Sequence, residues 1–212
     1  MARAGRTLER MPARAVTPEG REQRERILRA AIELFTAQGF RGASLDRVAA
    51  AVGISRQGVL HYFPSKTHLL LGVLDLRDEE TAVVANERAQ EGAPFSENLL
   101  ALVEHNQRNP DMTRLFTVLA GESAAPEHPG NERFRERYRF VRDGLAQGVR
   151  ESGEFDPAFD DRVVATLIAA VMDGLQLQFL LDPEAVDMIE PMRTLLTLLG
   201  GVTSAESGDG HP

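Results

Sequence analysis

Polar side chains suited to nucleic-acid recognition are concentrated between residues 55 and 66, in the run SRQGVLHYFPSK. Arg56 and Gln57 follow a serine, Ser55, that can cap a helix, so both fall in the first turn of that helix. Arginine pairs with guanine edges and glutamine with adenine edges when such a helix enters a major groove. We therefore predict a DNA-reading helix from Arg56 to about Tyr62, which Pro64 helps to end.

Other groups in and before this segment can complete a DNA contact. Gly58 would let the backbone approach the bases closely. Hydroxyl and ammonium groups, together with the amide groups at capped helix starts, suit phosphate oxygens. For His61 and Tyr62, the alternative to a DNA contact is packing within the protein. The candidate DNA-binding residues are Ser44, Ser55, Arg56, Gln57, Gly58, His61, Tyr62 and Lys66.

The residues before the reading helix form the elements that must position it. Ser44 can cap a short helix, and Gly53 lies where the chain must turn sharply with a positive φ. Val59 and Phe63, four residues apart, give the reading helix an inner face. The short helix has an apolar face made of Leu45, Val48, Ala49 and Val52.

The charge is divided unequally along the chain, whose formal net charge is −8. Residues 1–66 hold 12 Lys and Arg against 6 Asp and Glu, a balance of +6. Residues 67–212 hold 12 against 26, a balance of −14. Attraction to phosphate therefore belongs to the first third of the chain, and the acidic remainder makes a bulky polyanion an unexpected effector.

Helical periodicity extends through nearly all of the chain between its two ends, so we predict an all-α protein. Thr17 starts the first helix, and Gly39 closes it. Gly and Pro clusters bound the later helices, expected at residues 65–90, 95–108, 111–122, 131–152, 158–181 and 184–199, with a kink or late start at Pro191 in the last. The predicted division is a mobile basic arm (1–17), a helix-turn-helix DNA-binding domain (18–66), an effector-binding and dimerisation domain (67–200) and a disordered tail (201–212).

Several classes of protein are disfavoured by what the sequence lacks. It has no cysteine, and its five histidines, His61, His68, His105, His128 and His211, show no metal-ligand spacing. We expect no cofactor and no metal. No catalytic residues are expected either, because Asp160 and Asp161 are better placed to begin a helix than to catalyse a reaction. Without an evident export signal or membrane-spanning apolar run, a cytoplasmic protein is expected.

The segment SLDRVAAAVGIS and the run HYFPSKTHLL resemble the TetR family of bacterial transcriptional regulators, over about residues 24–71. That resemblance implies that the reading helix contacts bases and that Lys66 binds backbone phosphate. Tyr62 lies where the family often has a phosphate-binding His or Tyr. Leu60 lies where many members have a DNA-contacting Tyr. His61 is the candidate to replace that contact.

The long C-terminal part suits dimerisation and binding of a small molecule. The segment 158–181 is apolar around more than half of its circumference, so it must be covered on two sides, and 184–199 is its natural antiparallel partner. Two copies would form a four-helix bundle between subunits, as the last two long helices do in TetR-like proteins. The middle helices could enclose a largely apolar effector, with candidate contacts at His105, Arg108, Phe116, Phe134, Tyr138, Met172, Asp173 and Gln176.

These observations favour a homodimeric regulator that binds double-stranded, near-palindromic operator DNA, with repression relieved by the effector. The effector would act by shifting the helix that begins at Ser65 and joins the two domains through His68, Leu69 and Leu70. Activation instead of repression is open. The alternatives are an all-α enzyme and a protein-interaction module with a vestigial helix-turn-helix.

Overall fold

The computed structural model describes residues 17–200, and every element in that range is helical. The predicted all-α class is therefore confirmed. The predicted arm and tail lie outside the described residues, apart from Thr17. The helices are α1 (Pro18–Gly42), α2 (Leu45–Val52), α3 (Arg56–Tyr62), α4 (Lys66–Gln90), α5 (Phe95–Arg108), α6 (Pro110–Ser123), α7 (Asn131–Ser152), α8 (Asp161–Leu181) and α9 (Ile189–Leu199).

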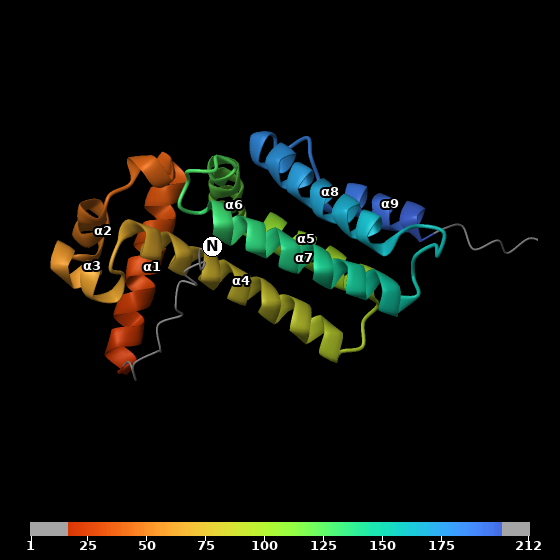
Figure 1. Cartoon of the computed structure of the whole chain (residues 1–212), viewed down its shortest axis with the longest axis horizontal. Helices are drawn as coiled ribbons and strands as arrows, with labels where there is room; N and C mark the ends of the chain where they lie inside the picture. The colour runs from red at the N-terminus through yellow and green to blue at the C-terminus, as the bar shows by residue number, and fades with distance from the viewer. Residues whose placement is uncertain (1–16, 201–212) are drawn as a thin grey trace, which may run out of the picture.

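Helices α1, α2 and α3 form a small unit at one end of the molecule (Figure 1). The Thr17 hydroxyl accepts the Gly20 amide at the start of α1, as expected for a cap. Gly39, expected as the end of this helix, has φ 66° and breaks it, after which the chain runs on to Gly42. The apolar faces of the three helices share one core, in which Phe35 and Val59 are fully buried.

Helix α4 leads from this unit into the larger helical part of the molecule (Figure 1). Ser65 caps it, because its hydroxyl accepts the His68 amide at 3.2 Å. Leu69 and Leu70 are fully buried in the core of the small unit, whereas His68 is exposed. The first turns of α4 thus belong to the core that holds α3.

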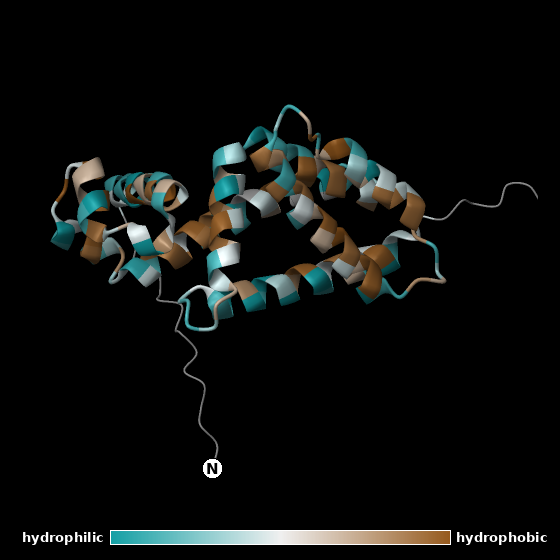
Figure 2. Ribbon diagram, turned by 90° about the horizontal axis from the view of Figure 1, so that it is seen from above, coloured by the Kyte–Doolittle hydropathy of each residue, from teal (hydrophilic) through white to brown (hydrophobic). Residues whose placement is uncertain are grey.

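The larger part contains α5 to α9, with α7 and α8 packed along one another. Figure 2 shows apolar residues on the facing sides of these helices. Phe116 of α6 and Phe134 of α7 belong to the core that continues from the small unit. Val103 of α5, Ile168 of α8 and Met192 of α9 belong to a second core.

Two boundaries differ from the sequence-based expectations. Helix α8 begins at Asp161 instead of residue 158, because the Asp160 carboxylate caps it by accepting the Arg162 and Val163 amides. Helix α9 begins at Ile189 instead of residue 184, and Asp187 accepts the amides of Ile189 and Glu190 before it. The expected late start of the last helix is confirmed, with Pro191 in its first turn, where its missing N–H costs nothing.

Helix α8 also corrects the expectation that no segment is apolar enough to cross a membrane. Within the described residues, it is the one helix with the required length and composition. Its inner face is part of the second core, through Val164 and Ile168. Its outer face is apolar as well, with Val163 and Leu177 exposed.

Candidate nucleic-acid interface and effector region

Helix α3 is held by its inner face and presents its polar face to solvent. Val59 is fully buried and Phe63 nearly so, whereas Arg56, Gln57 and His61 are exposed. The Ser55 hydroxyl accepts the Gly58 amide at 3.0 Å, which fixes the start of the helix. Arg56, Gln57 and His61 are therefore accessible to solvent on the helix that the core holds in place.

The turn between α2 and α3 has the predicted geometry. Gly53 has φ 71° and ψ 30°, a left-handed conformation that glycine adopts without strain. At the start of α2, the Ser44 hydroxyl accepts the Arg47 amide at 3.3 Å. Packing within the protein also favours glycine at position 58, which the sequence did not suggest. A Cβ there would lie 3.3 Å from Ile54 Cδ1.

Among the residues that the structure describes, Arg56 and His61 have only weak partners. Arg56 Nε lies 3.9 Å from Asp46 Oδ1, and both side chains are well exposed. An exposed pair at this distance contributes little, so the guanidinium is free to exchange it for a base. The His61 ring meets the Tyr62 ring edge-on, with centroids 5.3 Å apart. Leu60 is half-buried against the core, so its side chain serves packing.

Lys66 already has partners inside the protein. Its ammonium donates to the Phe40 carbonyl at 2.8 Å and to the Ala43 carbonyl at 2.9 Å, and it lies 4.4 Å from the centre of the Phe40 ring. It therefore ties the start of α4 to the connection between α1 and α2. A phosphate contact by the same ammonium stays a prediction.

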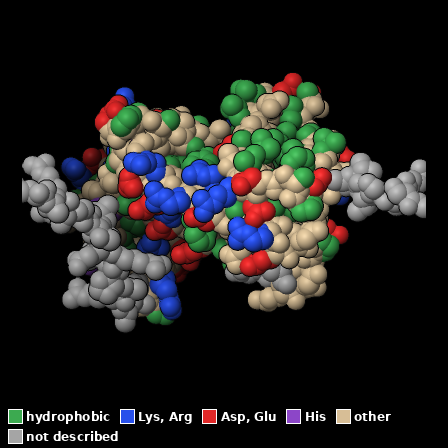
Figure 3. Space-filling model, turned by 45° about the vertical axis from the view of Figure 1, so that its right-hand side comes forward, with side chains coloured by type: hydrophobic (Ala, Val, Ile, Leu, Met, Phe, Trp, Pro, Cys, Tyr) green, Lys and Arg blue, Asp and Glu red, His purple; other side chains and the backbone are tan. Residues whose placement is uncertain are grey.

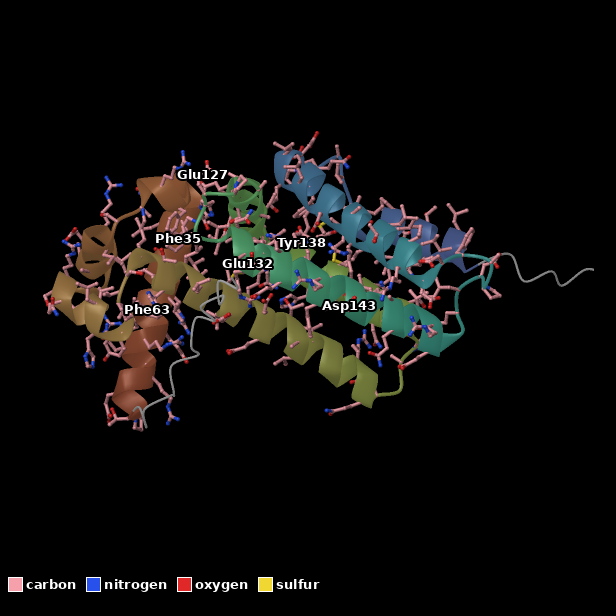
Figure 4. The ribbon with its side chains drawn as sticks, in the orientation of Figure 1. Phe35, Phe63, Glu127, Glu132, Tyr138 and Asp143 are labelled. Carbon is pink, nitrogen blue, oxygen red and sulfur yellow. The ribbon has the colours of Figure 1, made fainter. Side chains whose placement is uncertain are left out.

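Four of the predicted effector contacts lie close together between α6, α7 and α8. The Phe116 and Phe134 rings pack with centroids 5.2 Å apart. The Tyr138 hydroxyl donates to Asp173 Oδ2 at 2.6 Å (Tyr138 is labelled in Figure 4). Burial raises the pKa of Asp173, and burial together with this hydrogen bond raises the pKa of Tyr138.

Two arginines that were not among the predicted contacts complete this group. The guanidinium of Arg77, which is almost fully buried, lies 3.8 Å from the centre of the Phe116 ring, and that of Arg137 lies 4.4 Å from it. Burial lowers the pKa of Arg77 to about 10, and the nearby Arg137 charge adds to the effect. Arg77 Nη1 has no hydrogen-bond partner within the described part of the chain.

The other four predicted effector contacts lie elsewhere. Arg108 is exposed at the end of α5 and pairs with Glu104, and His105 lies one turn before it near Asn109. Met172 packs against the second core, and Gln176 is buried on the inner face of α8. These four residues do not join the group around Phe116.

A polar connection joins the larger part to the end of α1. Glu122 Oε2, at the end of α6, accepts the Phe40 amide at 2.9 Å. His128 is buried beside it and contacts the Ser123 hydroxyl at 2.9 Å through Nδ1. The sequence alone does not indicate this connection, because more than eighty positions separate these residues from Phe40.

Two family models match the chain. One, described as bacterial regulatory proteins of the tetR family, matches residues 27–73, which include α2, α3 and the start of α4. The other, described as the C-terminal part of BetI-type transcriptional repressors, matches residues 87–199, more than half of the chain. The chain belongs to the TetR family. The family resemblance of its N-terminal segment is thereby confirmed and extends to α9.

Two HTH-type transcriptional regulators are similar to this chain over different lengths. The regulator UidR of Escherichia coli K12 is 24% identical over 88% of this chain and 96% of its own length. TtgW of Pseudomonas putida, an uncharacterised regulator, is 42% identical over 31% of this chain and 48% of its own length.

Solved structures share the fold. NalD, the secondary repressor of the MexAB-OprM efflux pump in Pseudomonas aeruginosa, superimposes with a TM-score of 0.68 at 22% identity, over 85% of this chain and 95% of NalD. A Saccharomonospora viridis regulator in complex with choline superimposes with a TM-score of 0.64 at 24% identity, over 82% and 94%. This TetR-family chain is therefore a helix-turn-helix transcriptional regulator, and the enzyme and interaction-module alternatives are not favoured.

Proposed function

We propose that the chain is a homodimeric repressor that acts on cytoplasmic DNA, and that a small molecule releases it from a near-palindromic operator. One observation carries the DNA part of this proposal. Arg56 and Gln57 are exposed in the first turn of α3, and Val59 behind them is fully buried. A helix fixed in this way can enter a major groove with its N-terminal side chains against the bases.

The dimer is supported by the outer face of α8. Val163, Leu167, Leu177 and Leu181 recur along this helix and are exposed, as is Leu198 of α9. A continuous apolar face of this kind is typical of a protein-protein interface. Pairing two copies across α8 and α9 would form a four-helix bundle and carry two α3 helices on one assembly. Successive major grooves on one face of DNA are about 34 Å apart, which sets the spacing the dimer must meet.

The effector is proposed to act on the larger part of the chain, next to the connection between Glu122 and Phe40. The choline bound by the Saccharomonospora viridis regulator is a quaternary ammonium, and such cations are held by free aromatic faces. Here the guanidiniums of Arg77 and Arg137 already lie over the Phe116 ring. This arrangement gives no support to choline as the effector of this chain.

The DNA part is tested with the full chain and the DNA flanking its own gene, by fluorescence anisotropy over a range of salt concentrations. Arg56→Ala should weaken binding to that DNA by about tenfold or more and reduce the preference over unrelated DNA, because a good arginine-base contact contributes about 1–3 kcal/mol of discrimination. Arg88→Ala, in the exposed last turns of α4, is the matched control and should bind as the unaltered protein does. Unchanged preference in Arg56→Ala and Gln57→Ala alike would refute the assignment of α3.

A further inference from the structure

Helix α7 is rich in arginine although it lies in the acidic part of the chain. Five arginines fall between residues 133 and 142. Figure 3 shows Lys and Arg side chains gathered near the middle of one face of the molecule, beside many hydrophobic side chains. The arginines of α7 divide into two sets that differ in how their charge is balanced.

The set that faces α4 is neutralised. Arg133 Nη2 lies 3.0 Å from Asp75 Oδ1 and 2.7 Å from Asp78 Oδ2. Arg137 Nε lies 2.7 Å from the other oxygen of Asp78. Both arginines therefore form ion pairs that join α7 to α4.

The other set is spaced by four and three residues, so Arg135, Arg139 and Arg142 share one face of α7. Across the residues whose side chains are described, Arg139 and Arg142 have no carboxylate within 4.0 Å, and Arg135 has only the exposed Glu132 at 3.4 Å. An exposed ion pair of that kind contributes little to stability, so it does not explain why an arginine stands at position 135. Three positive charges therefore remain available to a ligand.

These three arginines line a groove of about 420 Å³ between the end of α6 and α7. Phe134, Tyr138, Ala120 and Ala124 supply its apolar surface, and Ser123 and Asn131 add polar groups. No acidic side chain is among its lining residues. The volume falls within the range of about 300–1,000 Å³ that is usual for small-molecule sites.

The chemistry of this lining selects one class of ligand. Guanidinium groups bind carboxylates and phosphates through paired hydrogen bonds, and several on one helix face concentrate that preference. The aromatic and alanine side chains would cover an apolar body attached to such a head group. We infer that the groove between α6 and α7 binds an amphipathic organic anion, and that this anion is the effector of the proposed repressor. The inference rests on the proposed function for its regulatory part only.

The groove is placed to affect DNA binding. Its wall includes Ser123, which directly follows Glu122, the residue that accepts the Phe40 amide at the end of α1. Asn131, also in the wall, donates to the Ser123 carbonyl at 2.8 Å. A ligand that draws α7 and the end of α6 together would therefore move the carboxylate that holds α1. The acidic balance of the whole region argued against a bulky polyanion, but this local surface is basic.

The test uses the full-length protein and four probes with the same alkyl chain, namely decanoate, decyl phosphate, 1-decanol and decyltrimethylammonium, all below micelle formation. Calorimetry should detect binding of decanoate and decyl phosphate, with the alcohol and the ammonium at least about tenfold weaker. Arg139→Gln/Arg142→Gln should weaken decanoate binding by at least about tenfold. Arg88→Gln/Arg114→Gln removes the same charge from exposed positions outside the groove and should leave decanoate binding unchanged.

Operator affinity without and with decanoate separates this inference from the proposed function. Decanoate should weaken operator binding of the unaltered protein and of the control, and not of the groove variant. Equal affinity for all four probes, or unchanged decanoate affinity in the groove variant, would overturn the anion site while leaving the repressor intact. A change of subunit number in the groove variant would also overturn it, because the groove would then be a contact between subunits. Binding of decanoate without any effect on the operator would remove the effector role, and failure of the unaltered protein to bind operator DNA would refute the repressor itself.

Discussion

Glu122 at the end of α6 holds Phe40 at the end of α1, through a hydrogen bond of 2.9 Å from the Phe40 amide to the carboxylate. The preceding residue, Gly39, has φ 66°, and a Cβ at that position would lie within 2.5 Å of Glu122 Oε1. The left-handed φ favours glycine there, and a Cβ would push the Glu122 carboxylate away from the Phe40 amide. The DNA-binding unit and the larger part are joined by a contact that a shift of α6 would break.

Removing this carboxylate should loosen the junction. Glu122→Ala should lower the free energy of unfolding by about 1.5–3 kcal/mol, the usual range for a hydrogen bond to a charged group. Gly39→Ala should also destabilise, because it combines an unfavourable φ with a collision. Glu127→Ala is the control, since Glu127 is exposed in the loop that follows α6 (labelled in Figure 4). Urea unfolding followed by circular dichroism measures all three, and equal stability of Glu122→Ala and Glu127→Ala would contradict the role of this contact.

The sequence predicts the local features of the fold well and the long-range ones poorly. The caps at Thr17, Ser44 and Ser55 and the left-handed Gly53 depend on residues within one turn, so they could be read directly. Pro191 indicated a late start of the last helix but not its exact residue, because residues 184–188 continue the apolar pattern. The Asp187 carboxylate, which accepts the Ile189 and Glu190 amides, lies directly before the observed start.

The candidate sites show the same division. The exposed residues of α3 followed from helical spacing, whereas the reason for Gly58 is its contact with Ile54, which depends on how the turn folds. Phe134 and Tyr138, which line the groove, were among the predicted effector contacts. The groove as a whole was not predicted, because helical spacing does not say which arginines of α7 meet Asp75 and Asp78. An arginine-rich helix in an acidic region was the one sequence signal that could have pointed to it.

His128 should make stability depend on pH. Burial lowers the pKa of His128 below its ordinary value of 6.5, so the unfolded chain takes up a proton more readily than the folded one. Stability should therefore fall as the pH falls through about 6.5 toward the folded-state pKa. His128→Asn keeps a side-chain acceptor for the Gly130 amide, which His128 Nδ1 accepts at 3.1 Å, but removes this titration.

The comparison is made by urea unfolding at about pH 7.5 and about pH 5.5. The difference between the two pH values should be smaller in His128→Asn than in the unaltered protein. Its stability at the higher pH should still be lower, because the edge contact with the Phe40 ring is lost. An identical loss on acidification in both proteins would show that His128 does not supply the dependence.

The outer face of α8 should decide the number of subunits. Leu167→Glu/Leu177→Glu places two charges on that face, where both leucines are close to half exposed. Burying unpaired carboxylates in an interface is costly, so the variant should be monomeric by light scattering and should lose most operator affinity. Val83→Glu, at an exposed apolar position on α4, should leave the dimer intact. A dimer in the double variant would place the interface elsewhere.

Lys66 should contribute both to the stability of the fold and to DNA binding. One substitution, measured by unfolding and by DNA affinity, can separate the two contributions. Lys66→Met keeps an apolar stem beside Phe40 but leaves the Phe40 and Ala43 carbonyls without their donor. The free energy of unfolding should fall by about 1–2 kcal/mol. If the ammonium also reaches a phosphate, affinity should fall equally for operator and unrelated DNA, and the salt dependence should decrease by about one phosphate contact.

Lys66→Arg is the matched control, because it keeps the charge and offers donors to the same carbonyls. It should retain the salt dependence of the unaltered protein even if its stability is somewhat reduced by the larger head group. We expect both effects in Lys66→Met, because an ammonium has three donors and only two of its contacts are short. The third, to the Arg41 carbonyl at 3.4 Å, is long enough to be exchanged for a phosphate oxygen. A loss of stability with an unchanged salt slope would limit Lys66 to holding α4 against the end of α1, and Tyr62 with the capped helix starts would then carry the phosphate contacts.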